Sequence, residues 1–136
     1  MTREFTIQME VRDHECDVQG IVNNSVYLNY LEHARHKMLR GLGVDFTGLA
    51  KKGIYLVVIQ NLIHYRHPLQ SGDDFTVTTV IGRESRLKIR FQQTIRRSRD
   101  QRLILEARVT GAAIDRDYRP LRLENIEEMK FMDNES

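Results

Sequence analysis

The sequence has few of the residues that mark a disulfide-linked, multidomain or membrane-embedded protein. It contains one cysteine, Cys16, so no disulfide can form within the chain and a reducing cytoplasm is the expected location. It has only two prolines and no linker or low-complexity segment, so the 136 residues (1–136) are expected to form one domain. No apolar run approaches the ~18 residues of a membrane span, and the N-terminus lacks a signal peptide's apolar block.

The chain also lacks a large net charge of either sign. Its formal charge is +2, which does not favour nucleic acid as a partner. Seven basic residues nevertheless gather within residues 83–99: Arg83, Arg86, Lys88, Arg90, Arg96, Arg97 and Arg99. They are typical of a solvated strand face or a charge-protected edge, or of a phosphate-binding site. A single-strand nucleic-acid site is disfavoured because the exposed stacking aromatics are missing.

One long amphipathic helix stands out among segments that otherwise favour strands. Asn23, Asn24 and Ser25 are suitable N-cap residues, and Gly41 and Gly43 are expected to end the helix. The apolar positions follow the spacing of a helix that buries one stripe: Tyr27, Tyr30, Leu31, Ala34, Met38 and Leu42. Such a helix needs a sheet to pack against.

Alternation of apolar and polar residues predicts strands at 5–11, 75–81, 87–96 and 103–113. The nearly continuous apolar segment 54–63 favours a strand with both faces covered. Short helical segments are expected at 45–52 and 123–129. Turn-length connections between the last three strands predict antiparallel pairing, so the expected class is α+β, with a five-stranded antiparallel sheet on one helix. One helix is too narrow to cover such a sheet, so a dimer, assembling further to a tetramer, is expected.

The polar segment between the first strand and the helix carries Asp17 and Gly20. Gly20 suits a tight backbone turn. Asp17 lies a few residues before the helix N-terminus, where free N–H groups and partial positive charge accumulate. Spacing alone favours the commoner role of such an aspartate, which is to cap a turn.

The segment Asp17-Val18-Gln19-Gly20-Ile21-Val22-Asn23-Asn24, followed by Tyr27 and Glu32-His33-Ala34-Arg35, resembles the signature of hot-dog-fold acyl-CoA thioesterases. It is most similar to the 4-hydroxybenzoyl-CoA thioesterase-like group. Tyr65-Arg66-His67-Pro68 and Gly72-Asp73 resemble the join between two strands in that family. The order of elements matches over essentially the whole chain.

The resemblance implies a hot-dog fold, in which the sheet wraps around the helix, with paired subunits and active sites at the dimer interface. It implies Asp17 as nucleophile or general base, beside Gly20 in the same motif, and a backbone N–H near Asn24 that polarises the thioester carbonyl. It implies no metal and no cofactor. Expected substrate contacts are Asn23 and Tyr27, together with Arg86 and Lys88, which would hold the CoA phosphates of a neighbouring subunit's site.

Other residues suggest competing chemistry that the sequence does not support. His14 and Glu15 lack the serine or cysteine motif that a triad requires, and Cys16 is better explained as a small, half-buried hydrophobe. His33 and His36 have no third metal ligand, so a solvated helix face is favoured. Glu32 lies ~12 Å along the helix from Asn24, which favours an ion pair, for example with Arg35, or an interface role.

The expected function is hydrolysis of an acyl-CoA to a free carboxylic acid and coenzyme A, in the cytoplasm, with neither nucleic acid nor membrane as partner. Two alternatives remain. One is hydrolysis of acyl groups carried on acyl carrier protein, and the other is a non-catalytic acyl- or nucleic-acid-binding module. The sequence does not identify the acyl group.

Overall fold

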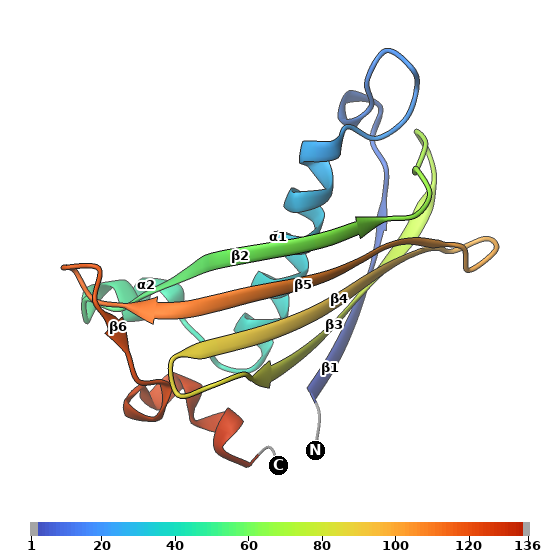
Figure 1. The fold of residues 1–136 in the computed structure, drawn as a ribbon. Helices are drawn as coiled ribbons and strands as arrows, with labels where there is room; N and C mark the ends of the chain where they lie inside the picture. The colour runs from blue at the N-terminus through green and yellow to red at the C-terminus, as the bar shows by residue number, and fades with distance from the viewer. Residues whose placement is uncertain (1–2, 135–136) are drawn as a thin grey trace.

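A computed structural model describes residues 3–134 of the chain, and the side chains of residues 3–132. One antiparallel sheet curves around a long helix (Figure 1). The elements in chain order are β1 (Arg3–Glu10), η1 (Asp13–Glu15), α1 (Asn24–Gly41), α2 (Phe46–Lys51), β2 (Tyr55–Tyr65), β3 (Asp74–Arg83), β4 (Lys88–Arg97), β5 (Leu103–Ile114), β6 (Pro120–Leu121), η2 (Leu123–Asn125) and η3 (Glu127–Asn134). The expected α+β class with five long strands is confirmed, and the two-residue β6 adds a short pairing with β5.

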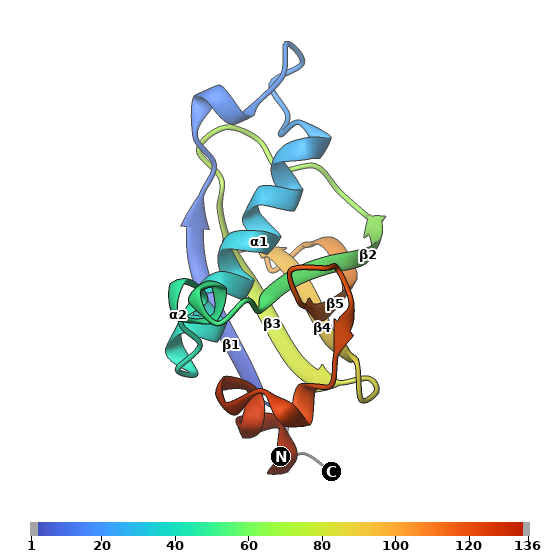
Figure 2. The same ribbon diagram turned by 90° about the vertical axis from the view of Figure 1, so that its left-hand side faces the viewer.

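Helix α1 forms where the sequence predicts it. The side chain of Asn23 accepts a hydrogen bond from the Ser25 N–H at 3.0 Å, so Asn23 is the N-cap. The predicted apolar stripe is buried from Tyr27 to Met38 and packs on the inner face of β3 and β1 (Figure 2). Burying each large apolar side chain contributes roughly 1.5–3 kcal/mol, so this stripe holds the helix in place.

The sheet order is β1-β3-β4-β5-β2. The β3-β4 and β4-β5 pairs are the antiparallel hairpins that the spacing predicts. Strands β2 and β3 are consecutive in the chain but do not pair, because the chain between them crosses from one edge of the sheet to the pair formed by β3 and β1. This crossover places the start of α1 beside the β2–β3 connection.

Strand β2 differs from its prediction in one respect. It pairs only with β5, and its other edge is open. Its large apolar side chains are 39–51% exposed: Tyr55, Val58, Ile59, Leu62 and Tyr65. A register shift between Val58 and Gln60 leaves Ile59 as an extra residue in this edge strand. Within residues 3–134 no strand pairs with this edge and these side chains stay exposed, so the expectation that both faces are covered is wrong for a single chain.

The two short helical predictions are confirmed with one change of type. Helix α2 falls within the expected segment 45–52, whereas residues 123–129 form 3-10 turns rather than an α-helix. These turns bury Leu123, Ile126 and Met129 against the open end of the fold below α1 (Figure 2). No helix within residues 3–134 is long and apolar enough to cross a membrane.

Candidate active site

Asp17 lies at the tip of a small hairpin that projects beyond the sheet (Figure 1). The hairpin arms pair at Cys16 and Val22, and the Gly20 N–H donates to the Asp17 carbonyl at 3.0 Å. Gly20 has φ +80, a conformation that favours glycine, so its predicted turn role is confirmed. The exposed Asp17 side chain accepts a hydrogen bond from the Gln19 N–H at 2.8 Å through Oδ1. Asp17 therefore caps this turn, and its second carboxylate oxygen has no partner within the described chain.

The base of the hairpin is held by buried hydrogen bonds. The Val22 N–H donates to the Leu69 carbonyl at 2.9 Å, and the Asn23 N–H donates to the Glu15 carbonyl at 3.1 Å. The Glu15 side chain is buried, where it accepts hydrogen bonds from the Tyr30 hydroxyl and the Arg12 N–H, both at 2.8 Å. Burial, and then this hydrogen bond to Glu15, raise the pKa of Tyr30 above its ordinary value. Glu15 is therefore a structural anchor for the hairpin.

The first backbone N–H of α1 faces a concave surface. Asn23 uses its side chain to cap Ser25, whereas no acceptor contacts the Asn24 N–H among the described residues. A cavity of about 300 Å³ lies here, lined by Ile21, Val22, Asn24, Tyr27, Tyr65, Arg66, His67 and Pro68. The hydroxyl of the buried Tyr27 accepts a hydrogen bond from the Leu69 N–H at 3.0 Å. A helix N-terminus with a free donor beside a cavity is suited to stabilising an oxyanion.

Arg86 and Lys88 lie at the other end of the molecule. Lys88 begins β4 and pairs with Ala112, which in turn pairs with Val57 at the start of β2. Both basic side chains are exposed. Figure 1 shows the start of β4 far from the hairpin that carries Asp17. Within one chain, these two residues cannot serve the same site as Asp17.

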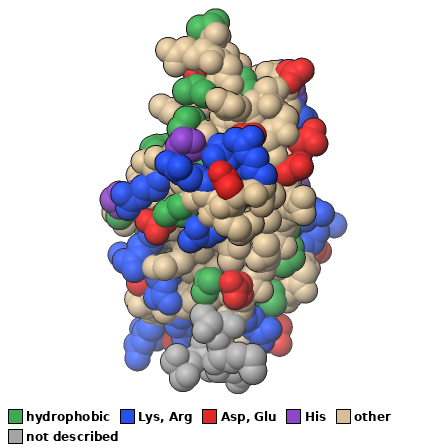
Figure 3. Space-filling view, turned by 90° about the vertical axis from the view of Figure 1, so that its right-hand side faces the viewer, with side chains coloured by type: hydrophobic (Ala, Val, Ile, Leu, Met, Phe, Trp, Pro, Cys, Tyr) green, Lys and Arg blue, Asp and Glu red, His purple; other side chains and the backbone are tan. Residues whose placement is uncertain are grey.

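Basic side chains do not form one continuous patch on the face shown in Figure 3. Lys and Arg side chains are spread over it, with Asp and Glu side chains among them. Arg97 is buried and forms a two-pronged contact with Asp100, which holds the pKa of that carboxyl well below its usual range. Arg97 therefore has a structural partner, whereas Arg86 and Lys88 are exposed to solvent.

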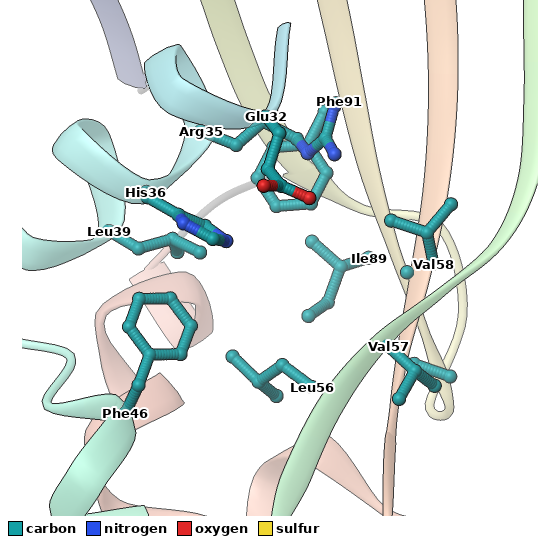
Figure 4. Close-up of a pocket in the computed structure, with 12 residues that line it drawn as sticks. Glu32, Arg35, His36, Leu39, Phe46, Leu56, Val57, Val58, Ile89 and Phe91 are labelled. Atoms are coloured by element: carbon teal, nitrogen blue, oxygen red, sulfur yellow. The ribbon is translucent and has the colours of Figure 1, made fainter. Parts of the chain in front are cut away.

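A second cavity, of about 290 Å³, opens between α1 and the start of β2 (Figure 4). Its apolar wall comes from Leu39, Phe46, Leu56, Val57, Val58, Ile89, Phe91 and Ala112. Three ionisable side chains of α1, Glu32, Arg35 and His36, complete the lining. Burial lowers the pKa of Arg35 and of His36.

The expected ion pair of Glu32 and the expected solvated position of His36 are both wrong, whereas an interface role for Glu32 stays a prediction. Among the described residues, no ion pair within 4 Å joins Glu32 to Arg35 or His36. Arg35 is only 7% exposed and donates to the Gln93 side chain at 3.0 Å. His36 is half-buried against Phe46, with ring centroids 5.0 Å apart, rather than solvated.

Sequence reasoning missed Gln93, the residue that holds Arg35. Its side-chain amide donates to the Leu31 carbonyl at 3.0 Å and to the Thr79 hydroxyl at 2.9 Å. The available signal was its position, because Gln93 is the one polar residue in the inward-facing series Ile89, Phe91, Gln93 and Ile95. No group of three metal-ligating side chains occurs within the part of the chain that the structure describes.

Comparison with known proteins decides the family. Residues 11–131 match the thioesterase-like superfamily. The chain belongs to this superfamily. The acyl-acyl carrier protein thioesterase ATL3 of Arabidopsis thaliana, a chloroplastic protein, is 35% identical over 97% of this chain and 70% of its own length. The long-chain acyl-CoA thioesterase FadM of Escherichia coli is 30% identical over 79% of this chain and 81% of its own.

The solved structures agree on the fold. The 1,4-dihydroxy-2-naphthoyl-CoA thioesterase Slr0204 of Synechocystis superposes with a TM-score of 0.84, covering 89% of this chain and 90% of its own, at 19% identity. The expected hot-dog fold and thioesterase family are therefore confirmed, and with them the expected enzyme class, a thioester hydrolase. In this thioesterase, the family motif coincides with the hairpin and helix start described above.

Proposed function

We propose that this thioesterase hydrolyses acyl-CoA, with Asp17 as the general base or nucleophile and the Asn24 N–H as the oxyanion donor. The supporting observation is the anchored hairpin, which presents an exposed carboxylate just before a helix whose first N–H lacks an acceptor. A thioester carbonyl at this N–H develops negative charge during attack, and the donor and helix dipole stabilise it.

The reaction balances with water as the only co-reactant. As general base, Asp17 takes a proton from water while the oxygen attacks the carbonyl carbon. As nucleophile, its free carboxylate oxygen attacks the carbon and water then cleaves the resulting anhydride. In both routes the C–S bond breaks and the thiol leaves with a proton, giving the free acid and coenzyme A. The Gln19 N–H on Oδ1 orients the carboxylate in either case.

A second chain completes the proposed site. An edge strand with exposed Val58, Ile59 and Leu62 invites antiparallel pairing with another copy of itself. A two-fold axis near the middle of β2 brings Tyr65 of one copy opposite Tyr55 of the other. The ring centroids of Tyr65 and Tyr27 lie 5.6 Å apart, so the start of α1 lies next to Tyr65 and would approach the second copy with it. Each hairpin would then lie beside the second copy's 290 Å³ cavity, which supports that cavity as the acyl pocket.

The same pairing supports Arg86 and Lys88 as contacts for the CoA phosphates. Lys88 lies in a cross-strand row with Ala112 and Val57, at the end of β2 that the second copy's hairpin would approach. Of the two further proposed substrate contacts, Tyr27 lines the first copy's cavity at the helix start, and Asn23 caps the helix beside that cavity. We further propose that the chain is one domain, that dimers associate into tetramers, and that the enzyme works in a reducing compartment such as the cytoplasm, which its single cysteine supports.

Acyl carrier protein is the second candidate carrier. It is supported by the similarity to ATL3, which is named for that substrate class. Free-thiol release from matched acyl-CoA and acyl-carrier-protein thioesters tests both proposals. Hydrolysis of the CoA series with a higher kcat/KM supports the first candidate, whereas preference for the carrier protein supports the second. Binding without thiol release from either would indicate a non-catalytic module.

A further inference from the structure

The cavity beside β2 contains a buried cation that forms no direct ion pair with a carboxylate among the described residues. Arg35 is more than nine-tenths buried, and no carboxylate oxygen lies within 4 Å of it among the described residues. One nitrogen, Nη1, donates to Gln93 at 3.0 Å, and the guanidinium carbon lies 5.9 Å from the centroid of the Phe91 ring. A guanidinium has five N–H donors and no acceptor, so most of its hydrogen-bonding capacity remains available at the cavity.

The other polar groups of the cavity determine which ligand atom suits it. Glu32, on the same face of α1, lines the cavity as a carboxylate that can accept a hydrogen bond. His36 also lines the cavity, and burial lowers its pKa, which favours the uncharged imidazole. The formal charges of Glu32 and Arg35 therefore cancel. The rest of the wall is mainly apolar, and Figure 4 shows Leu56, Val57, Val58 and Ile89 across the cavity from α1.

We propose that Arg35 selects acyl groups that carry a neutral oxygen substituent, a hydroxyl or an oxo group, over plain hydrocarbon acyl groups. The proposal rests on the proposed function, because it takes this cavity as the acyl pocket. An oxygen substituent accepts a hydrogen bond from the guanidinium, and a hydroxyl can also donate to Glu32. A hydrocarbon chain displaces water from Arg35 and leaves buried donors unpaired, which is unfavourable.

An anionic acyl group fits less well. A terminal carboxylate would pair with Arg35 but would be repelled by Glu32 in the same cavity. The volume of about 290 Å³ lies near the lower end of the roughly 300–1,000 Å³ found for small-molecule pockets, which is room for a short chain or a ring. The cavity therefore combines an apolar wall with one polar side, as small-molecule pockets commonly do.

A purely structural role for Arg35 makes a different prediction. In that case Arg35 only ties α1 to β4 through Gln93, and its loss would lower stability and affect all substrates equally. Thr79→Val provides the matched control. It removes the Thr79 hydroxyl that accepts from Gln93, on the same network, but Thr79 does not line the cavity. This variant should lower the melting temperature without changing the preference among acyl groups.

The experiment compares kcat/KM for acyl-CoA pairs that differ only by one oxygen: saturated against 3-hydroxy and 3-oxo chains of equal length, and benzoyl against hydroxybenzoyl. The wild type should favour at least one oxygenated partner by about 10- to 100-fold, the range for one hydrogen bond to a charged group. Arg35→Met should bring that ratio to about 1, Arg35→Lys should keep part of it, and Thr79→Val should keep all of it. Equal losses on both members of each pair, or no preference in the wild type, would overturn the proposal, as would a preference for carboxylate-tipped chains.

A binding measurement separates this proposal from the proposed function. Non-hydrolysable thioether analogues of the same pairs are titrated calorimetrically into the wild type and into Arg35→Met. If no thioester is hydrolysed, the proposed function fails, but tighter binding of the oxygenated analogue that disappears in Arg35→Met still supports the selectivity of the cavity. Equal binding of both analogues to the wild type overturns it.

Discussion

The two halves of helix α1 carry different kinds of groups. At its N-terminus, a carboxylate is exposed on an anchored hairpin and a backbone N–H is left without an acceptor. Eleven residues further on, about 16 Å at ~1.5 Å per residue, Arg35 is buried in a cavity at the end of the sheet that also carries Lys88. In the proposed site, the N-terminal half offers groups for reaction and the second half offers groups for binding. We propose that the open β2 edge brings the two sets of groups together from different copies of the chain.

The largest expected effect comes from removing the reactive group. Asp17→Asn should lower kcat by about 10²- to 10⁴-fold, because an amide neither takes a proton from water nor attacks a carbonyl effectively. The amide oxygen can still accept from the Gln19 N–H, so the turn should persist. The measurement is thiol release at saturating substrate, with melting temperature as the control for folding. Near-wild-type turnover would show that Asp17 only caps its turn.

The next effect tests the strand that is proposed to pair two copies of the chain. In a two-fold β2 pair centred near residue 60, Leu62 lies opposite Val58 of the other copy, so Leu62→Lys places an unpaired charge against an apolar side chain twice in each dimer, and burying such a charge is costly. We expect dissociation to monomers, detected by sedimentation, and a loss of specific activity that deepens on dilution. Gln8→Lys is the matched control, since it puts the same charge at an exposed position on the opposite edge strand. An intact dimer in the Leu62 variant would exclude β2 as the interface.

A smaller effect is expected at the binding end. Arg86→Ala with Lys88→Ala should raise KM for CoA thioesters roughly 2- to 30-fold, because each exposed ion contact contributes about 0.2–1 kcal/mol. The salt dependence of KM should flatten, since salt screens such contacts. An unchanged KM at low salt would leave these residues as part of a solvated strand.

Mixing two variants sharpens the comparison further. If each site takes Asp17 from one chain and the basic pair from the other, a mixed dimer of the Asp17 variant with the Arg86/Lys88 variant contains one intact site. Activity at low substrate concentration should then rise above the average of the two parent proteins after exchange of subunits. No rise, with exchange verified by native mass spectrometry, would show that Arg86 and Lys88 do not serve the site that contains Asp17 of the other copy.

The smallest effect on activity is expected from the hairpin's anchor. Tyr30→Phe removes the hydrogen bond to Glu15 and should lower the free energy of unfolding by about 1.5–3 kcal/mol, with kcat little changed. Because burial and Glu15 raise the pKa of Tyr30, its contribution to stability is fully present below about pH 10 and is lost as the pH rises towards the raised pKa. Denaturant unfolding from pH 8 to 11 should show this decline in the wild type and a weaker one in the variant.

Most local features of the fold and of the candidate site could be predicted from the sequence. The helix, its Asn23 cap, the Gly20 turn and the five long strands each depend on residues a few positions apart, and the structure has them in the expected places. Asp17 and Asn24 were found through a contiguous motif, which also identified the family. These features can be predicted because they are caused by periodicity, capping and backbone conformation. All three depend on residues that are close together in the sequence.

The tertiary structure decided what depends on distant residues. An apolar run such as β2 has the same sequence whether it lies at the centre or the edge of a sheet, and only its pairing with β5 alone shows that it is an edge. Arg35 has the spacing of a surface ion pair, yet it is buried because Gln93, 58 positions away, accepts its hydrogen bond. Glu15 and Tyr30 became an anchor for the same reason. Contacts between residues far apart in the chain leave no local pattern, because chain folding, rather than spacing, brings them together.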